Sequence, residues 1–226
     1  MTRIPIVTGL LALAVCGWAG IQKERGKSLE AKSITWEISN LSKIDGNPVT
    51  VLGAPSIVET GSGKALSFNG HNDGIVLDVN PIDGASAFTI EAVFQPAAGG
   101  EKEQRWLHVE AADNEDRALL EIRLDGDKWF LDTFIKGGEA RLPLYAENFK
   151  HPVGPWYHVA LVYDGAEMRH YVNGQLELSG ALKVNPLKGG KTSLGVRMNR
   201  VYWFKGLIRK ARFTNAALTP DKFMPL

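Results

Sequence analysis

The chain has 226 residues, with 26 Lys and Arg against 25 Asp and Glu, so its formal net charge at pH 7 is +1. This balance gives no basic footprint for nucleic acid and no polybasic segment for an anionic membrane. The single cysteine excludes a disulfide scaffold and a zinc ribbon. A hydrophobic content of 44% is ordinary for a globular protein, and the length suits one large β-domain.

The N-terminal residues 1–19 have the pattern of a secretory signal peptide. One Arg is followed by an uncharged stretch that extends to Gly20. The stretch is shorter than the roughly 20 apolar residues of a spanning helix, and Pro5 interrupts it. We therefore expect cleavage after Ala19 and a mature chain without a transmembrane span.

The segment that follows, residues 20–33, is polar and predicts a short tether. The residues up to Cys16 also resemble a lipoprotein signal, in which the cysteine is lipidated. The expected location is therefore outside the cytoplasm, either periplasmic, extracellular or lipid-anchored at the cell envelope.

Residues 34–226 predict an all-β domain. Gly-containing turns recur too often for long helices, and Asp164-Gly165 and Asn173-Gly174 are placed to connect three antiparallel strands as a meander. A short helix is expected after Thr219-Pro220. The runs rich in β-branched, aromatic and Leu residues that predict strands are 34–38, 65–68, 75–79, 88–94, 105–110, 118–124, 128–135, 156–163, 168–172, 175–178, 192–196 and 201–213. We expect these strands to form a two-sheet antiparallel sandwich.

Four motifs, in this order, resemble the laminin-G-like, concanavalin A-like lectin/glucanase domain family. They are Gly63-Lys64-Ala65-Leu66-Ser67-Phe68-Asn69-Gly70, Phe88-Thr89-Ile90-Glu91-Ala92-Val93-Phe94, Trp156-Tyr157-His158-Val159-Ala160 with the turns that follow, and Phe204-Lys205-Gly206-Leu207-Ile208. The resemblance implies a jelly-roll β-sandwich over residues 34–226. It says little about function, because this fold hosts lectins, adhesion domains, glycosidases and lyases.

Catalytic patterns of such enzymes are weak in this sequence. Glycosidases that resemble laminarinases carry a Glu-x-Asp-x-x-Glu strand, and no Glu-x-Asp occurs here. The acidic cluster at 113–116 lies between two predicted strands and suggests a solvated loop. Glu121-Ile122-Arg123 and Leu107-His108 faintly resemble patches of alginate lyases, but the Tyr- and Lys-rich final strand of those enzymes has no counterpart. A lyase or hydrolase is therefore only the second alternative.

Polar residues alternate with apolar ones in three consecutive predicted strands. In 104–110, strict alternation predicts Trp106, His108 and Glu110 on one face, opposite Arg105. In the next two strands, Glu121 and Arg123 are expected to point away from the core, and Asp132 to share a face with Phe130 and Phe134. The expected ligand-binding residues are Arg105, His108, Glu121, Arg123 and Asp132.

Three interpretations of this face remain open. Aromatic rings that stack on sugars, together with charged groups that bind hydroxyls, would make it a carbohydrate groove. An antiparallel sheet also commonly leaves one face solvated, which would make it an ordinary polar surface. Alternatively, Arg123 pairs with Asp132 or Glu121 in a buried network.

The stretch 197–204 is a second candidate surface. Arg197, Asn199 and Trp203 combine cations and aromatics there and are expected to bind ligand, unless Tyr202 and Phe204 enter the core. His158 is interpreted as a core or network histidine that could neighbour His170. Two histidines without a third ligand do not form a zinc site.

A calcium ion is the one cofactor that the sequence suggests, and none is strictly required. Asn69, Asn72 and Asp73 match a loop that helps to hold Ca²⁺ in domains that this one resembles. In many of those domains an acidic residue follows the last strand's Gly-x-Ile, and Arg209-Lys210 occupies that position here.

These observations favour an exported, non-catalytic module that binds a polysaccharide or glycoconjugate. The first alternative is a protein-interaction or adhesion module whose partner is a surface protein.

Overall fold

The computed structural model describes Met1 and residues 31–113 and 115–226. The predicted signal peptide beyond Met1 and most of the predicted tether lie outside the described residues. Ala31–Leu226 forms one compact unit. In the described part of the chain, no helix is long and apolar enough to cross a bilayer.

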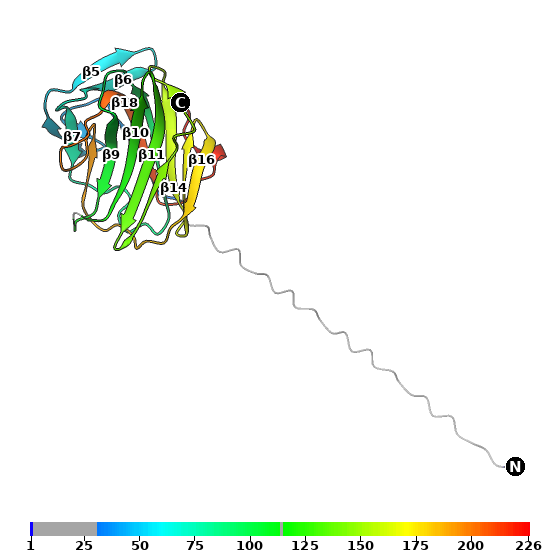
Figure 1. Ribbon diagram of the computed structural model, residues 1–226. Helices are drawn as coiled ribbons and strands as arrows, with labels where there is room; N and C mark the ends of the chain where they lie inside the picture. Colours follow the sequence, from blue (N-terminus) through cyan, green and yellow to red (C-terminus); the bar gives the residue numbers. More distant parts are fainter. Residues whose placement is uncertain (2–30, 114) are drawn as a thin grey trace. The chain divides into compact units, whose positions relative to one another are not determined.

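Two large antiparallel sheets form the layers of a sandwich (Figure 1). The back sheet has the order β16-β15-β14-β8-β18-β6-β5, and β1 pairs with the second half of β18. Its strands are β1 Ser33–Glu37, β5 Ser56–Thr60, β6 Gly63–Asn69, β8 Phe88–Pro96, β14 Tyr157–Tyr163, β15 Glu167–Val172, β16 Gln175–Ala181 and β18 Lys205–Thr214.

The front sheet has the order β12-β11-β10-β9-β17-β7-β4, and β13 pairs with β11. Its strands are β4 Thr50–Leu52, β7 Gly74–Leu77, β9 Glu103–Glu110, β10 Arg117–Asp125, β11 Lys128–Gly137, β12 Ala140–Tyr145, β13 His151–Pro152 and β17 Lys191–Leu194. A small hairpin joins β2 Lys43–Ile44 to β3 Asn47–Pro48. The predicted all-β jelly-roll sandwich is confirmed.

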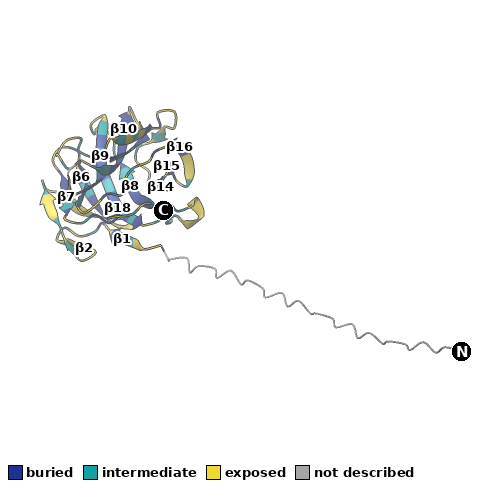
Figure 2. Cartoon of the chain, turned by 90° about the horizontal axis from the view of Figure 1, so that it is seen from below, coloured by how far each residue is buried: buried dark blue, intermediate teal, exposed yellow. Residues whose placement is uncertain are grey.

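The core between the sheets is held by stacked aromatic rings. Phe94 of β8 lies 4.4 Å from the Trp106 ring and 5.1 Å from the Trp129 ring, so one back-sheet residue packs on two front-sheet residues. All three are fully buried, and burial of each such side chain stabilises the fold by about 1.5–3 kcal/mol. In Figure 2 the central strands are mostly buried and the connecting loops mostly exposed.

The predicted meander is present as β14, β15 and β16. Asn173 and Gly174 join the last two strands with φ angles of 48° and 78°. Positive φ at both positions gives the turn a twist that matches the strands, and Asn and Gly tolerate this conformation best. This local chemistry explains why the meander is readable from sequence.

The last strand begins later than expected. Residues 201–204 are not part of β18, which starts at Lys205, and they belong instead to a loop that lies along β9, where the Arg105 N–H donates to Tyr202 O. The expected short helix is the 3-10 helix Pro220–Lys222, although the Thr219 side chain makes no capping hydrogen bond to it. Strands β4, β5 and β12 were not predicted, because their residues mix polar, proline and apolar types.

The C-terminal segment covers part of the back sheet's outer face. Glu91 is fully buried and accepts hydrogen bonds from Arg212 Nε at 2.6 Å and from the Met224 backbone at 2.7 Å. His158 Nε2 lies 3.0 Å from the same carboxylate, so its network role is confirmed. His170 pairs with Leu161 and points to the core, so the two histidines are on opposite faces and are not neighbours.

Candidate functional site

A β-bulge in β9 decides which residues of this strand face outward. Where β9 pairs with β10, two residues of β9 take the place of one, and Trp106 is the extra residue. Trp106 and Leu107 are consequently both core residues. The expected alternation is therefore wrong for two residues: Trp106 points to the core, and Arg105, expected on the opposite face, shares the outer face with His108 and Glu110.

The next two strands follow the predicted alternation. Glu121 of β10 lies opposite Arg105 on one side and Asp132 of β11 on the other. Arg123 lies opposite Phe130, one step further along the same face. The outer face of the front sheet thus brings together all five residues expected from the strand pattern.

Four of these five residues form a connected set of ion pairs with Glu103. Arg123 donates from Nε and Nη2 to Asp132 Oδ2, both at 2.8 Å, and it also contacts Glu103. Arg105 Nε donates to Glu121 Oε2 at 2.8 Å. We call Glu103, Arg105, Glu121, Arg123 and Asp132 the ion-pair network. The interpretation in which Arg123 pairs with Asp132 or Glu121 is the one that this geometry matches.

Two carboxyl groups of the ion-pair network, those of Glu121 and Asp132, have raised pKa values. The side chains of Glu121 and Asp132 are each 5% exposed, and three carboxylates meet two guanidinium groups. Burial and the neighbouring Asp132 raise the pKa of Glu121 to about 7, against the lowering effect of Arg105 and Arg123. Burial also raises the pKa of Asp132. A proton on Glu121 leaves two carboxylates for two arginines.

The loop 195–204 folds over the same face. The Arg105 backbone N–H donates to Tyr202 O at 2.9 Å, and the Arg105 guanidinium lies 4.0 Å from the centre of the Tyr202 ring. The Met198 N–H donates to His108 Nδ1 at 3.0 Å. The two surfaces predicted separately are therefore one surface. Phe204 enters the core as considered, whereas Tyr202 packs beneath Arg105 on the outer face.

Two residues of this loop have strained backbone conformations. Arg200 has φ of 60° and Tyr202 has φ of 62°, both in the left-handed region that β-carbons disfavour. Such strain costs on the order of 1–3 kcal/mol per residue and concentrates at functional sites. Asn199 is exposed at the loop's tip, and Trp203 is half-buried.

A group of cations lies beside the ion-pair network, and we call Arg117, Lys191, Arg197 and Arg200 the cationic patch. Among the described residues, none of its members forms an ion pair within 4.0 Å, in contrast to Arg105 and Arg123. Lys191, Arg197 and Arg200 line a hollow of about 220 Å³. Desolvation and the positive charges of Arg117 and Arg105 lower the pKa of Arg197.

His108 lies between the ion-pair network and the cationic patch. Its side chain is 0% exposed. Burial, followed by the charges of Arg197, Arg117 and Arg105, lowers its pKa to about 3, so the ring is neutral at pH 7. Glu110, whose pKa is raised by burial, lies 3.7 Å from Nε2, too far for a hydrogen bond.

At the other end of the face is an aromatic platform. Tyr145 of β12 is 44% exposed, and its ring packs edge-on against Phe130 at 4.8 Å. The Arg123 guanidinium lies 5.6 Å from the Tyr145 ring centre. Both aromatic residues line a hollow of about 380 Å³ that also includes Lys102, Asp125, Glu147, Asn148 and Lys150.

Sequence reasoning missed four residues of this site: Glu103, Arg117, Lys191 and Tyr145. Glu103, Arg117 and Lys191 stand at or near strand ends, where periodicity carries little information. Tyr145 belongs to β12, whose Pro143 and charged residues hid the strand. The alternation of Arg141, Pro143 and Tyr145 with Leu142 and Leu144 is the signal that could have located it.

The loop expected to hold calcium brings Asn69, Asn72 and Asp73 together. Asn69 Oδ1 accepts the His71 N–H at 2.8 Å and the Asn72 N–H at 3.1 Å. Asp73 Oδ1 accepts the Ala54 N–H at 2.8 Å. These oxygens therefore fix the loop's own backbone. In the described part of the chain, no group of three or more His, Cys, Asp or Glu side chains is arranged to hold a metal, and calcium binding stays a prediction.

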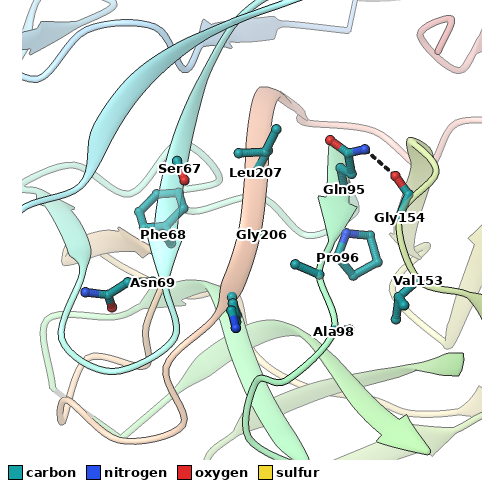
Figure 3. Close-up of a pocket in the computed structure, with 12 residues that line it drawn as sticks. Ser67, Phe68, Asn69, Gln95, Pro96, Ala98, Val153, Gly154, Gly206 and Leu207 are labelled. Carbon is teal, nitrogen blue, oxygen red and sulfur yellow. Dashed lines mark hydrogen bonds between the residues drawn. The ribbon is translucent and has the colours of Figure 1, made fainter. Parts of the chain in front are cut away.

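A further hollow of about 630 Å³ lies at one end of the back sheet (Figure 3). Its walls include Phe68, Pro96, Val153 and Leu207, and Lys205 is the only charged residue among those that line it. Gln95, the main polar side chain, is already bonded to Gly154 O. Of the residues expected to bind ligand or metal, only Asn69 borders this hollow, so it offers less directional chemistry than the front sheet.

Solved structures with the same fold include carbohydrate-related domains. Domain 4 of AbnA, an extracellular arabinanase from Geobacillus stearothermophilus determined with arabinotriose, has a TM-score of 0.63 at 22% identity, covering 85% of this chain and 96% of that one. The binding domain of botulinum neurotoxin DC in complex with SialylT has a TM-score of 0.60 at 12% identity, covering 84% of this chain and 49% of that one.

The binding domain of Paraclostridial Mosquitocidal Protein 1 is similar as well, with a TM-score of 0.60 and 16% identity, covering 83% of this chain and 49% of that one. This chain thus spans about half of the two toxin domains. At these identities the likeness concerns the fold alone.

A search of curated proteins found no match to this sequence. The family model described as the concanavalin A-like lectin/glucanases superfamily matches residues 69–222, which is more than half of the chain. This match covers three of the four sequence motifs in full and agrees with the two-sheet sandwich. The chain therefore belongs to the concanavalin A-like lectin/glucanase superfamily.

Proposed function

We propose that this protein is an exported, non-catalytic module that binds a polysaccharide or glycoconjugate on the outer face of its front sheet. The observation that carries the proposal is the combination on one face of fixed charged groups and an exposed aromatic ring. The face extends across β9, β10, β11 and β12, and the loop 195–204 borders it at β9.

The chemistry of this face suits sugar hydroxyls. A hydroxyl both donates and accepts hydrogen bonds, so a saccharide needs carboxylates and guanidinium groups close together. Arg105 and Arg123 are held by their carboxylate partners at 2.8 Å. Groups held in place lose little conformational entropy when a ligand binds.

The aromatic platform supplies the apolar part of recognition. Sugar rings present C–H groups on one face, and an exposed aromatic ring packs against them. Tyr145 is fixed by the edge of Phe130 and by the guanidinium of Arg123, yet 44% of its surface is open. The hollow of about 380 Å³ beside it can hold a sugar unit.

The distribution of the carboxylates favours binding over hydrolysis. Glu121 and Asp132 are both engaged by arginines and 5% exposed, which leaves them poorly accessible as an acid and nucleophile pair. A solved domain with the same fold was determined in complex with arabinotriose, which supports a saccharide as the ligand.

The test is binding of the full chain to a panel of neutral and acidic polysaccharides, followed by analysis of the soluble phase for released sugar or unsaturated product. We expect retention without product. Tyr145→Ala should weaken retention roughly tenfold, on the scale of one aromatic contact. Ile57→Ala is the matched control. Ile57 is an apolar residue of the back sheet, and like Tyr145 it is 44% exposed.

Retention on no saccharide would overturn the proposal and favour a surface-protein partner. Release of product would make the protein a lyase or hydrolase, and Glu121→Gln would then be the variant to compare.

A further inference from the structure

The cationic patch and the adjacent His108 each hold a hydrogen-bond donor that lacks an acceptor in the described part of the chain. Arg117 Nε and His108 Nε2 are both buried without a partner among the described residues. Arg197 has no ion pair, although it is partly buried and close enough to Arg105 and Arg117 for their charges to act on it. Buried donors in native structures usually have partners, so these two donors are expected to meet an acceptor from outside the described residues, such as water or a ligand.

The tautomer of His108 follows from its one hydrogen bond. The Met198 backbone N–H donates to Nδ1 at 3.0 Å, so Nδ1 is the acceptor and the neutral ring carries its proton on Nε2. Nε2 is therefore a donor. The nearest carboxylate oxygen, on Glu110, is 3.7 Å away and does not accept this proton. His108 thus adds a directed donor to a region already rich in cations.

The positions of the cations define an open site. Lys191, Arg197 and Arg200 line the hollow of about 220 Å³, in which Asp78 is the single carboxylate. Arg197 precedes Met198, whose N–H bonds to His108, so the hollow adjoins His108. Glu110 lies opposite both Arg117 and Lys191 on the neighbouring strands, so two carboxylates stand among four cations.

We infer that the saccharide bound on this face carries an oxyanion, either a carboxylate or a sulfate ester, and that Arg197, Arg117 and Lys191 bind it beside His108. The inference rests on the proposed function, because it names the substrate class of the same face. An oxyanion would accept from the partly exposed groups of Arg197 and Lys191 and would balance the excess positive charge. The neighbouring ion-pair network, whose charges are already matched, would bind the neutral hydroxyls.

The test compares saccharides that differ only in the anion. Calorimetry with the full chain would use polygalacturonic acid and its carboxyl-reduced form, and a sulfated galactan and its desulfated form. We expect one acidic member to bind at least about tenfold more tightly than its neutral counterpart, since charge-assisted hydrogen bonds have that strength. Binding should also weaken as the salt concentration rises from about 0.05 to about 0.5 M, because the Debye length shortens roughly threefold over this range.

Arg197→Gln is the decisive variant. It should lower the affinity for the acidic member roughly ten- to a hundredfold and leave the affinity for the neutral member unchanged. Lys183→Gln, which removes one exposed positive charge outside this face, controls for net charge. Thermal unfolding of each variant shows that it is folded, and Arg117→Gln provides a second, independent position.

The outcomes separate the two ideas. Equal affinity for the charged and neutral members of both pairs would overturn the oxyanion site while the carbohydrate-binding proposal survives. Binding to no saccharide at all would overturn both. A loss of acidic binding in Lys183→Gln as large as that in Arg197→Gln would also count against the site, because bulk charge would then explain it.

Discussion

The ion-pair network and the cationic patch lie side by side on one face of the front sheet. The arginines of the network are paired with carboxylates, whereas the cations of the patch form no ion pair among the described residues. In the network, Arg105 and Arg123 each have a carboxylate oxygen at 2.8 Å. In the patch, no member has an ion pair among the described residues, and the pKa of Arg197 is lowered rather than raised. The pKa of Arg123 is raised, chiefly through Asp132, despite its burial.

This difference indicates that the ion-pair network contributes mainly to the stability of the fold and the cationic patch mainly to ligand binding. A network that satisfies its own charges gains little from a charged ligand, and removal of one member leaves a buried charge unpaired. A patch with unmatched charges is destabilising in the free protein and gains from a partner. Four substitutions test this separation.

Arg123→Met should have the largest effect. It leaves Asp132 and Glu121 buried with one fewer cation, and we expect a loss of about 3–5 kcal/mol in the free energy of unfolding at pH 8, measured by urea denaturation. The loss should be smaller at pH 5, because both carboxyl groups have raised pKa values and then take up protons. Arg141→Met, at an exposed position of β12, should change stability by no more than about 0.5 kcal/mol. Similar effects of the two variants would contradict the structural role of the network.

His108→Gln tests the boundary between the two regions. The pKa of His108 is lowered from 6.5 to about 3, so below pH 6.5 the unfolded chain binds more protons than the folded chain. The stability due to the neutral ring is present above pH 6.5 and is lost as the pH falls toward 3. By pH 5 the loss should be about 2 kcal/mol. Urea titrations at several pH values should show a shallower acid loss in the variant.

His170 provides the comparison for that experiment. Burial alone lowers its pKa from 6.5 to about 3, without nearby cations. In the double variant that also carries His170→Gln, the free energy of unfolding should therefore change even less between about pH 5 and 6.5. An unchanged pH dependence in both variants would show that the histidines are not held neutral.

Glu121→Gln should have a smaller effect of opposite sign. Because the pKa of Glu121 is raised from 4.5 to about 7, the folded chain binds more protons than the unfolded chain between these values. This group therefore makes the protein less stable as the pH rises from about 4.5 to about 7. The neutral variant lacks that decline, and at pH 8 it should be more stable by about 1 kcal/mol, after loss of one charge-assisted hydrogen bond. A destabilised variant at pH 8 would mean that the third carboxylate is needed in its charged form.

Arg197→Gln should have the smallest effect on stability. Removal of a partly desolvated charge close to Arg117 and Arg105 should raise the free energy of unfolding by about 0.5 kcal/mol, measured by calorimetry. The same substitution is expected to abolish most oxyanion affinity. A variant that loses stability and binding together would show that Arg197 has a structural role instead.

The predictions made from sequence succeeded where a pattern is local. Asn173-Gly174 specifies its turn by its own backbone preferences, and β10 and β11 alternate without interruption, so the shared face of Glu121, Arg123 and Asp132 was readable. They failed at Trp106, because a bulge depends on how β9 pairs with β10 and is invisible in one strand.

The sequence by itself determined the sandwich, through its turns, its apolar alternation and its family motifs. Only the tertiary structure decided that loop 195–204 lies along β9, that Arg197 lies near His108, and that Tyr145 remains exposed. The physical reason is that strand periodicity depends on neighbours along the chain. Ion pairing, desolvation and unmatched charge depend instead on residues that are brought together from distant segments.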